Sequence, residues 1–352
     1  MTTSAAPSDA RIGVTVLTGF LGSGKTTLLN RMVREPRFAQ SAVVINEFGS
    51  IGIDHHLVRH VADNVRVVEG GCICCMVRGG LADTLRDLFL LALRRAIQPF
   101  RHVLIETSGL ASPAPVLFTL RHEHFLAERY VYNGTIAVAD AQRVVAQLAS
   151  EPEAIQQLAL ADEVAISKAD LASQAQVRAA GEAVLRVNPT ARVHVLEREG
   201  PLPAGLLAER LYRGRPPAAP RGTPWLGRYS RRGWPPGGSE AGPDLPAHDV
   251  AVATLILPPS IPRAAFVRGM SALQAELGVS LLRMKGLVRF EGDAAPSAVH
   301  GVHDKLYPIV PLSEWPDVED DPRLVFIARG LDAAELDKRV RLHLGLGQVG
   351  GA

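Results

Sequence analysis

The sequence has few cysteines, almost no net charge and no long apolar run. Only three cysteines occur among 352 residues, and all of them lie within positions 72–75. A stabilising disulfide framework would spread its cysteines along the chain, so the fold does not depend on one. The formal net charge of +2 gives no overall preference for nucleic acid or for a membrane surface. Neither is expected as a partner.

Segments that would direct the chain to a membrane are also missing from the pattern. No uninterrupted apolar run approaches the roughly 20 residues that span a bilayer. Residues 1–10 are small and polar and lack the apolar core of a secretory signal. We therefore expect a cytoplasmic location, where glutathione and thioredoxin would keep the thiols reduced.

The chain does contain enough apolar residues for two globular domains. Hydrophobic residues make up 47% of the chain and charged residues 21%, which is ordinary for soluble domains of about 100–200 residues each. Short apolar runs alternate with helical periods, the runs lying at 12–17, 42–45, 65–68, 102–105, 135–138, 163–166 and 192–195, and the helices at 25–34, 81–97, 141–149 and 173–187. This alternation predicts an α/β P-loop domain at residues 1–212, with a mostly parallel, doubly wound sheet.

The composition changes at residues 213–247, which hold eight prolines and seven glycines. Such a segment cannot bury enough apolar surface to order itself, so we expect a linker or a long loop. Trp225, Tyr229 and Trp234 lie inside it and would either pack on a domain or dock a partner.

A different pattern follows this linker. Predicted strands lie at 250–257, 280–291, 297–308 and 323–329, and predicted helices at 262–277 and 332–344. Three strands in a row after one helix indicate an antiparallel sheet with helices on one face. We therefore expect a smaller C-terminal α+β domain at residues 248–345.

A complete phosphate-binding loop occupies residues 19–26. It follows a predicted strand and opens a predicted helix, which is the context that this motif requires. Its glycines let backbone N–H groups curl around phosphate oxygens at the helix N-terminus. Lys25 would reach the β- and γ-phosphates, and the Thr26 hydroxyl would bind Mg²⁺. The residues expected to contact the nucleotide here are Gly22, Ser23, Gly24, Lys25, Thr26 and Thr27.

An acid and then a glycine follow the predicted strand at 102–105. Glu106 is placed to hold Mg²⁺, directly or through water, although it could instead cap the next segment. The Gly109 amide is placed to sense the γ-phosphate. Lys25, Thr26 and Glu106 are therefore the candidate catalytic residues, and no residue stands out as the group that positions the attacking water.

A Ser-Lys-Ala-Asp tetrapeptide at residues 167–170 points to the base of the nucleotide. In a GTPase the last residue of such a segment accepts hydrogen bonds from guanine, and the lysine stem packs on the base. Adenine offers no matching donors, so Asp170 and Lys168 favour GTP. GTPases usually have Asn at the first position. The Ser167 hydroxyl can still make one hydrogen bond in place of that Asn, which predicts weaker discrimination between bases.

The three cysteines form a candidate metal site. Cys72, Cys74 and Cys75 follow two glycines that permit the sharp turn needed for three neighbouring side chains to converge. Three thiolates make a partial shell for Zn²⁺, which prefers four ligands. The fourth ligand could be water, a carboxylate such as Glu47, or a group from another protein. Cu(I) and Co²⁺ are alternative metals, and a thiol–disulfide role for the C-x-x-C pair is a competing interpretation.

Other polar groups lie near these motifs. Glu47 and Asp54 follow the second predicted strand, where P-loop GTPases commonly carry a switch; the alternative is a polar turn. Histidines at spacings that can bind metal are His55 and His56 with His60, His122 with His124, and His300 with His303. Most surface histidines bind no metal, so these pairs are weaker candidates than the cysteines.

Five motifs occur in a fixed order: Gly-Phe-Leu-Gly-Ser-Gly-Lys-Thr-Thr, Asn-Glu-Phe-Gly, Gly-Cys-Ile-Cys-Cys, Glu-Thr-Ser-Gly and Ser-Lys-Ala-Asp. With them the chain resembles the CobW-type family of P-loop metallochaperone GTPases, which includes zinc-regulated GTPase metalloprotein activators and is related to the GTPases that insert nickel into urease and hydrogenase. The resemblance covers nearly the whole chain, because the family also carries a C-terminal α+β domain.

The resemblance implies a GTPase that binds zinc at Cys72, Cys74 and Cys75 and delivers it to a client metalloprotein on GTP hydrolysis. GTP, Mg²⁺ and Zn²⁺ are the implied cofactors, with Co²⁺ as an alternative, and a homo-oligomer is compatible with it. Other members are linked to cobalamin synthesis or to nitrile hydratase activation. The alternative function is therefore a nucleotide-gated assembly or docking factor for cobalt or iron enzymes. A small-molecule kinase is disfavoured, since no acceptor pocket or base is recognisable.

Two departures from the family pattern affect these expectations. Members often have an acidic residue after Asn-Glu-Phe-Gly, where this chain has Ser50, so an auxiliary metal ligand is lost there. Many members also carry a His-rich tract near the domain junction, where this chain has the Arg/Pro/Gly-rich segment. A secondary store of metal is therefore not expected.

Overall fold

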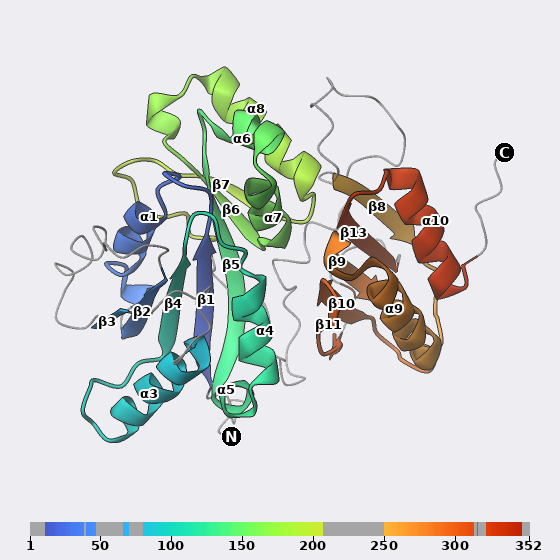
Figure 1. The fold of residues 1–352 in the computed structure, drawn as a ribbon, viewed down its shortest axis with the longest axis horizontal. Coiled ribbons are helices and arrows are strands. Elements are labelled where there is room, and N and C mark those ends of the chain that lie inside the picture. The colour runs from blue at the N-terminus through green and yellow to red at the C-terminus, as the bar shows by residue number, and fades with distance from the viewer. Residues whose placement is uncertain are drawn as a thin grey trace, which may run out of the picture. The chain divides into compact units, whose positions relative to one another are not determined.

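The computed structural model describes residues 11–38, 40–46, 66–69, 80–206, 250–312, 315 and 322–346. The chain divides into two compact units, one formed mainly by residues up to 213 and the other mainly by residues from 214 onward (Figure 1). The proposed linker at 213–247, with Trp225, Tyr229 and Trp234, lies outside the described residues. The two units are described separately below.

A parallel sheet forms the centre of the first unit. Its order is β3-β2-β4-β1-β5-β6-β7, and every pairing between neighbouring strands is parallel. The strands are β1 (Ile12–Thr18), β2 (Ser41–Asn46), β3 (Arg66–Glu69), β4 (His102–Thr107), β5 (Tyr130–Asp140), β6 (Glu163–Ser167) and β7 (Arg192–Val195). The first strand in the sequence is central, and its two neighbours, β4 and β5, come from much later in the chain.

Helices cover both faces of this sheet, so the prediction of a doubly wound α/β fold is confirmed (Figure 1). They are α1 (Lys25–Met32), α3 (Leu81–Leu93), α4 (Ala114–His122), α5 (His124–Arg129), α6 (Val144–Ser150), α7 (Pro152–Leu160) and α8 (Gln174–Val187), with short 3₁₀ turns at η1 (Pro36–Phe38) and η2 (Ala169–Leu171). Successive side chains of a strand point to opposite faces. Accordingly, Leu17 packs with Leu28 of α1 on one face, and Val16 packs with Leu85 of α3 on the other.

Strand β5 is longer than the sequence pattern indicates. The apolar run predicts a start at residue 135, whereas the strand begins at Tyr130. Asn133 and Gly134 interrupt the run, and the pairing of β1 with β5 shifts register between Val14 and Thr15. The extra length carries the buried Tyr130, whose hydroxyl donates to the Leu85 carbonyl oxygen at 2.7 Å and whose pKa is raised by burial.

The second unit contains a separate antiparallel sheet with the order β11-β10-β9-β13-β8, and β12 also pairs with β10. The strands are β8 (Val250–Ile256), β9 (Leu281–Val288), β10 (Ser297–Val302), β11 (Lys305–Leu306), β12 (Val310–Pro311) and β13 (Arg323–Arg329). The helices are α9 (Arg263–Leu277) and α10 (Ala333–Leu344), and η3 (Gly278–Ser280) follows α9. The expected α+β architecture is therefore confirmed.

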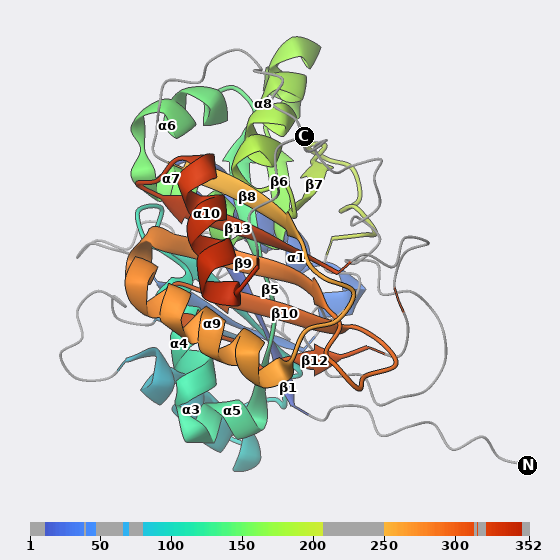
Figure 2. The same ribbon diagram turned by 90° about the vertical axis from the view of Figure 1, so that its right-hand side faces the viewer.

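Both helices of this unit lie on one face of its sheet (Figure 2). The core between the helices and the sheet contains Phe266, Met284 and Phe326, all buried. The two helices approach closely at Gly269, where an added Cβ atom would lie 2.3 Å from the His343 carbonyl oxygen. A side chain at this position would force the helices apart, so the glycine sets their spacing.

Candidate nucleotide site

The phosphate-binding loop connects the central strand β1 to helix α1. Gly19, Gly22 and Gly24 have φ values of 138°, 70° and 98°, in the region that residues other than glycine rarely adopt. An added Cβ atom on Gly19 would also lie 2.4 Å from the Val138 carbonyl oxygen of β5. Gly24 is the N-cap of α1, so the helix begins at Lys25 with its N–H groups directed at the loop. This geometry is an anion site formed by backbone.

Glu106 lies beside the start of α1. It is the last residue but one of strand β4, pairs with Leu17 of β1, and is 3% exposed. The Thr26 hydroxyl donates to Glu106 Oε1 at 2.8 Å. The two residues are far apart in sequence, and the pairing of β1 with β4 brings them together. Two oxygen-bearing side chains in contact beside a phosphate loop are the hard ligands that Mg²⁺ uses.

Lys25 is folded back over the loop. Its side chain is mostly buried, and its Nζ donates to the Phe20 carbonyl oxygen at 3.4 Å. Thr27, two residues after Lys25, is exposed. The loop therefore presents a lysine, a hydroxyl and its N–H groups at one end of β1, and their contacts with a nucleotide stay a prediction.

Gly109 lies directly against the phosphate loop. An added Cβ atom would lie 2.8 Å from the Leu21 nitrogen and 2.6 Å from Leu21 Cδ2. Backbone cannot move aside cheaply, so the segment after β4 can approach the loop this closely only with glycine here. This placement is compatible with the expectation that its amide senses the third phosphate.

Ser167 and Lys168 both hold the phosphate loop through its carbonyl oxygens. The Ser167 hydroxyl donates to the Ser23 oxygen at 2.6 Å and lies 3.3 Å from the Ala139 oxygen. Lys168, in a left-handed conformation with φ 56°, donates from Nζ to the Gly22 oxygen at 2.7 Å. The Ser167 hydroxyl thus contacts the loop, and its expected contact with the base stays a prediction.

Asp140 is a residue of this site that the sequence analysis did not identify. It ends β5, is 1% exposed, and its Oδ2 atom lies 2.7 Å from Lys168 Nζ. Its other oxygen accepts a hydrogen bond from the Gln142 nitrogen at 2.9 Å. An acidic residue at the carboxyl end of the strand next to β1 was the available signal.

Asp170 lies on the η2 turn, outside this set of contacts with the loop. Its carboxylate is one-third exposed, and an oxygen lies 3.9 Å from Arg198 Nη1, which is itself mostly exposed. A solvent-screened pair at this distance contributes little to stability. The carboxylate is therefore accessible to a ligand, as recognition of a base requires.

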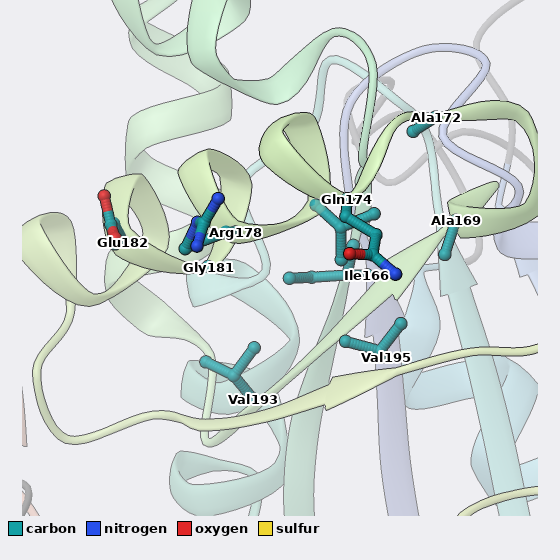
Figure 3. A pocket seen from close by; sticks show the side chains of 10 residues that line it. Ile166, Ala169, Ala172, Gln174, Arg178, Gly181, Glu182, Val193 and Val195 are labelled. Carbon is teal, nitrogen blue, oxygen red and sulfur yellow. The ribbon is translucent and has the colours of Figure 1, made fainter.

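A pocket of about 480 Å³ lies between α8 and the strands β6 and β7. Figure 3 shows Ile166, Val193 and Val195 among its lining residues, with Arg178 and Glu182 on α8. It reaches Ala169 of the tetrapeptide, but no residue of the phosphate loop lines it. The phosphate site is therefore separate from this pocket.

The predicted metal site lies outside the described residues, which include none of Cys72, Cys74, Cys75, Glu47 or Asp54. His55, His56 and His60 lie outside them as well. Within the described ranges, no group of three or more His, Cys, Asp or Glu side chains is arranged to hold a metal ion. The pairs His122 with His124 and His300 with His303 therefore have no third ligand of this kind there.

Two family models match the chain. The model described as "CobW/HypB/UreG, nucleotide-binding domain" matches residues 13–195, and "Cobalamin synthesis protein cobW C-terminal domain" matches residues 254–342. The chain belongs to the CobW/HypB/UreG family. The resemblance seen in the sequence motifs is confirmed.

Curated relatives within this family carry zinc in their names. The chain is 36% identical over 196 residues to the zinc chaperone YjiA of Escherichia coli, covering 56% of this chain and 60% of that protein. It is 29% identical over 189 residues to zinc-regulated GTPase metalloprotein activator 1 of Schizosaccharomyces pombe, covering 52% of this chain and 45% of that protein. The matches thus span between two-fifths and three-fifths of these and similar CobW relatives.

A solved structure matches both units of the fold. The Zn(II)-bound YjiA GTPase from Escherichia coli superposes with a TM-score of 0.67 at 25% identity, covering 96% of this chain and 99% of that chain. The P-loop architecture of this CobW-family chain is therefore shared with a known GTPase. Among the helices in the described ranges, none is long and apolar enough to cross a membrane.

Proposed function

We propose that this CobW-family chain is a GTP-dependent metallochaperone that binds zinc and passes it to a client metalloprotein when GTP is hydrolysed. The relatives named zinc chaperones and GTPases support this assignment. The structural observation that carries it is the contact of the Thr26 hydroxyl with the Glu106 carboxylate at the start of α1. This is an oxygen pair suited to Mg²⁺ beside a loop suited to phosphate.

Residues at the carboxyl edge of the parallel sheet would bind the nucleotide. The loop N–H groups and Lys25 would bind the phosphates, and Thr26 with Glu106 would hold Mg²⁺, which neutralises charge that develops on the phosphates. Gly109 would offer its amide to the third phosphate. Lys25, Thr26 and Glu106 act by orienting and stabilising charge, so turnover without a partner should be slow.

Recognition of guanine is assigned to Asp170. Its carboxylate accepts hydrogen bonds and would pair with the guanine N1–H and exocyclic amine, donors that adenine does not offer at the same positions. Ser167 and Lys168 would support it indirectly, because both brace the phosphate loop. The nucleotide is therefore GTP rather than ATP in this proposal.

The zinc site is proposed at Cys72, Cys74 and Cys75, with Glu47 as an additional ligand. Thiolates are the ligands that Zn²⁺ prefers in proteins, and Co²⁺ is an alternative cargo. GTP with Mg²⁺ would order the segments that carry these residues, and hydrolysis would loosen them and release the metal. Reciprocity then requires that zinc tighten GTP binding by the factor by which GTP tightens zinc binding.

A competitive Zn²⁺ titration of the reduced protein tests this coupling. The titration is run with Mg²⁺ and either a non-hydrolysable GTP analogue or GDP. We expect about tenfold tighter zinc binding with the analogue, which corresponds to about 1.4 kcal/mol of coupling. Cys74→Ser should abolish the gain by removing a ligand. Lys25→Ala should also abolish the gain, because it prevents nucleotide binding. The zinc affinity of this variant, measured with no nucleotide present, should equal that of the wild type.

Equal zinc affinity in the two nucleotide states would contradict the chaperone mechanism. The metal would then be structural, and the nucleotide-gated docking factor would become the better assignment. In that case Cys74→Ser should lower the thermal stability of the protein, and GTP turnover should follow only the folded fraction.

A further inference from the structure

Gln157 is a buried amide on a helix that is otherwise apolar on its inner side. Its side chain is 1% exposed, and Leu158, Ala159 and Leu160 beside it are buried as well. Burying an amide costs free energy unless its polar atoms find hydrogen-bond partners. The position of this side chain therefore depends on what it contacts.

Both contacts of the Gln157 nitrogen are backbone carbonyl oxygens of the segment that follows β4. Nε2 donates to the Gly109 oxygen at 3.0 Å and to the Ala111 oxygen at 3.1 Å. The amide oxygen, Oε1, is buried and has no hydrogen-bond partner among the described residues. One amide group thus holds two carbonyl groups of the turn at residues 108–111, and it does so at the cost of an unsatisfied acceptor.

Gly109 is held from two sides. On one side it touches the phosphate loop, where an added Cβ atom would lie 2.8 Å from the Leu21 nitrogen. On the other side its carbonyl oxygen is held by Gln157 of α7. The N–H of Gly109 and this carbonyl belong to consecutive peptide units, so a shift of the N–H towards a phosphate also moves the carbonyl.

We infer that Gln157 is a positioning residue that sets the Gly109 amide for the third phosphate and transmits the nucleotide state to α7. The inference rests on the proposed GTP site. The nucleotide with three phosphates draws the Gly109 N–H towards its third phosphate, and the two hydrogen bonds pass that displacement to α7. The nucleotide with two phosphates leaves the segment where Gln157 holds it.

Gln157→Met tests the inference. Methionine is close to glutamine in length and volume but lacks the two donors, and it also removes the buried acceptor, so the melting temperature should change little. Gln156→Met is the matched control, because Gln156 is the preceding residue of the same helix and is partly exposed. The dissociation constants for a non-hydrolysable GTP analogue and for GDP are measured with Mg²⁺ for the wild-type protein and both variants.

We expect Gln157→Met to reduce the preference for the GTP analogue over GDP by about fivefold, while affinity for GDP changes little. Gln156→Met should keep the wild-type ratio. Amide hydrogen exchange of α7 provides a second readout: its protection should differ between the analogue and GDP in the wild type, and this difference should be lost in Gln157→Met. If Gln157→Met does not fold, the exchange comparison in the wild-type protein decides alone.

An unchanged affinity ratio in Gln157→Met would overturn the inference, and so would an equal loss of affinity for both nucleotides, which indicates a merely structural role. Exchange in α7 that is the same with the analogue and with GDP would overturn it too. Wild-type protein that binds neither nucleotide would instead overturn the proposed function, and the inference with it. The two failures are therefore distinguishable.

Discussion

The Ser167 hydroxyl donates a 2.6 Å hydrogen bond to the carbonyl oxygen of Ser23, which joins the end of β6 to the phosphate loop. Because Ser23 is also buried, this bond is shielded from water. It gives the first residue of the Ser-Lys-Ala-Asp tetrapeptide a contact with the loop that is independent of any base.

Ser167→Ala should therefore weaken the binding of all nucleotides alike. Loss of one buried hydrogen bond corresponds to about 1 kcal/mol, or about fivefold in affinity. Isothermal titration with GDP and with inosine diphosphate, which lacks the exocyclic amine of guanine, measures the effect. A loss confined to GDP would show that Ser167 contacts the base.

Asp140 and Lys168 should show strong energetic coupling. Asp140 is 1% exposed and accepts from Lys168, whose ammonium also reaches the Gly22 oxygen. Hydrogen bonds to charged groups are worth about 1.5–3 kcal/mol, so Asp140→Asn should destabilise the protein by about that amount. A double-mutant cycle with Lys168→Met, measured by urea unfolding, isolates the pair. Additive effects would contradict a direct interaction.

Asp170→Asn should change the base preference without disturbing the fold. The carboxylate is one-third exposed and its one described ion pair, with Arg198, is weak, so stability should stay within about 0.5 kcal/mol of the wild type. Affinity for GDP should fall by about tenfold or more, because a charged acceptor is lost. Xanthosine diphosphate should bind the variant better than it binds the wild type, since its added carbonyl oxygen accepts a hydrogen bond from the introduced amide. Unchanged GDP affinity would remove Asp170 from base recognition.

The stability of the second unit should fall as the pH drops below about 6.5. Burial lowers the pKa of His303, opposed by backbone contacts with Leu281 and Val279 and by Asp304. A folded-state pKa below the unfolded value of about 6.5 means that the folded state binds fewer protons. The neutral form of His303 is therefore stabilising above that pH, and this contribution is lost as the pH falls through the folded-state pKa.

His303→Asn isolates this contribution. Asparagine tolerates the φ of 50° at this position and does not titrate. The urea-unfolding midpoint followed by circular dichroism should decline less between pH 7 and 5 than in the wild type. His124→Asn, at a side chain that is 90% exposed, is the control and should keep the wild-type profile. Parallel pH profiles for wild type and His303→Asn would assign the acid sensitivity to other groups.

Local patterns predicted much of the fold. The limits of β7 and β13 match the predicted ranges to the residue, and for β13 the reason is plain, because Pro322 and Gly330 bound its run. Helix α7 was not predicted, since it is only nine residues long and one of its polar residues, Gln157, is buried among apolar neighbours instead of lying on an exposed face. Asn133 and Gly134 interrupt the apolar run of β5, so the first part of this strand was not predicted.

Motif spacing names the loop residues as candidates because they stand in consecutive positions, and it names Glu106 because an acid followed by a glycine ends an apolar run. The roles of these residues in nucleotide binding stay predictions. Motif spacing could not predict Gln157 or Asp140, whose partners lie 48 and 28 residues away and are defined only by the packing of α7 and β5. The roles of Cys72, Cys74 and Cys75 stay predictions, since they lie outside the described residues.

The strand order β4-β1-β5 also has a consequence for the synthesis of the chain. Strand β1 and its loop are made first, but β4 begins only at residue 102, β5 at 130, and the brace from Ser167 and Lys168 comes later still. At bacterial or eukaryotic elongation rates the loop waits on the order of ten seconds for these partners. A nascent chain that ends before residue 168 should therefore be unable to hold nucleotide, and ligand binding can assist only the late stage in which the first unit folds.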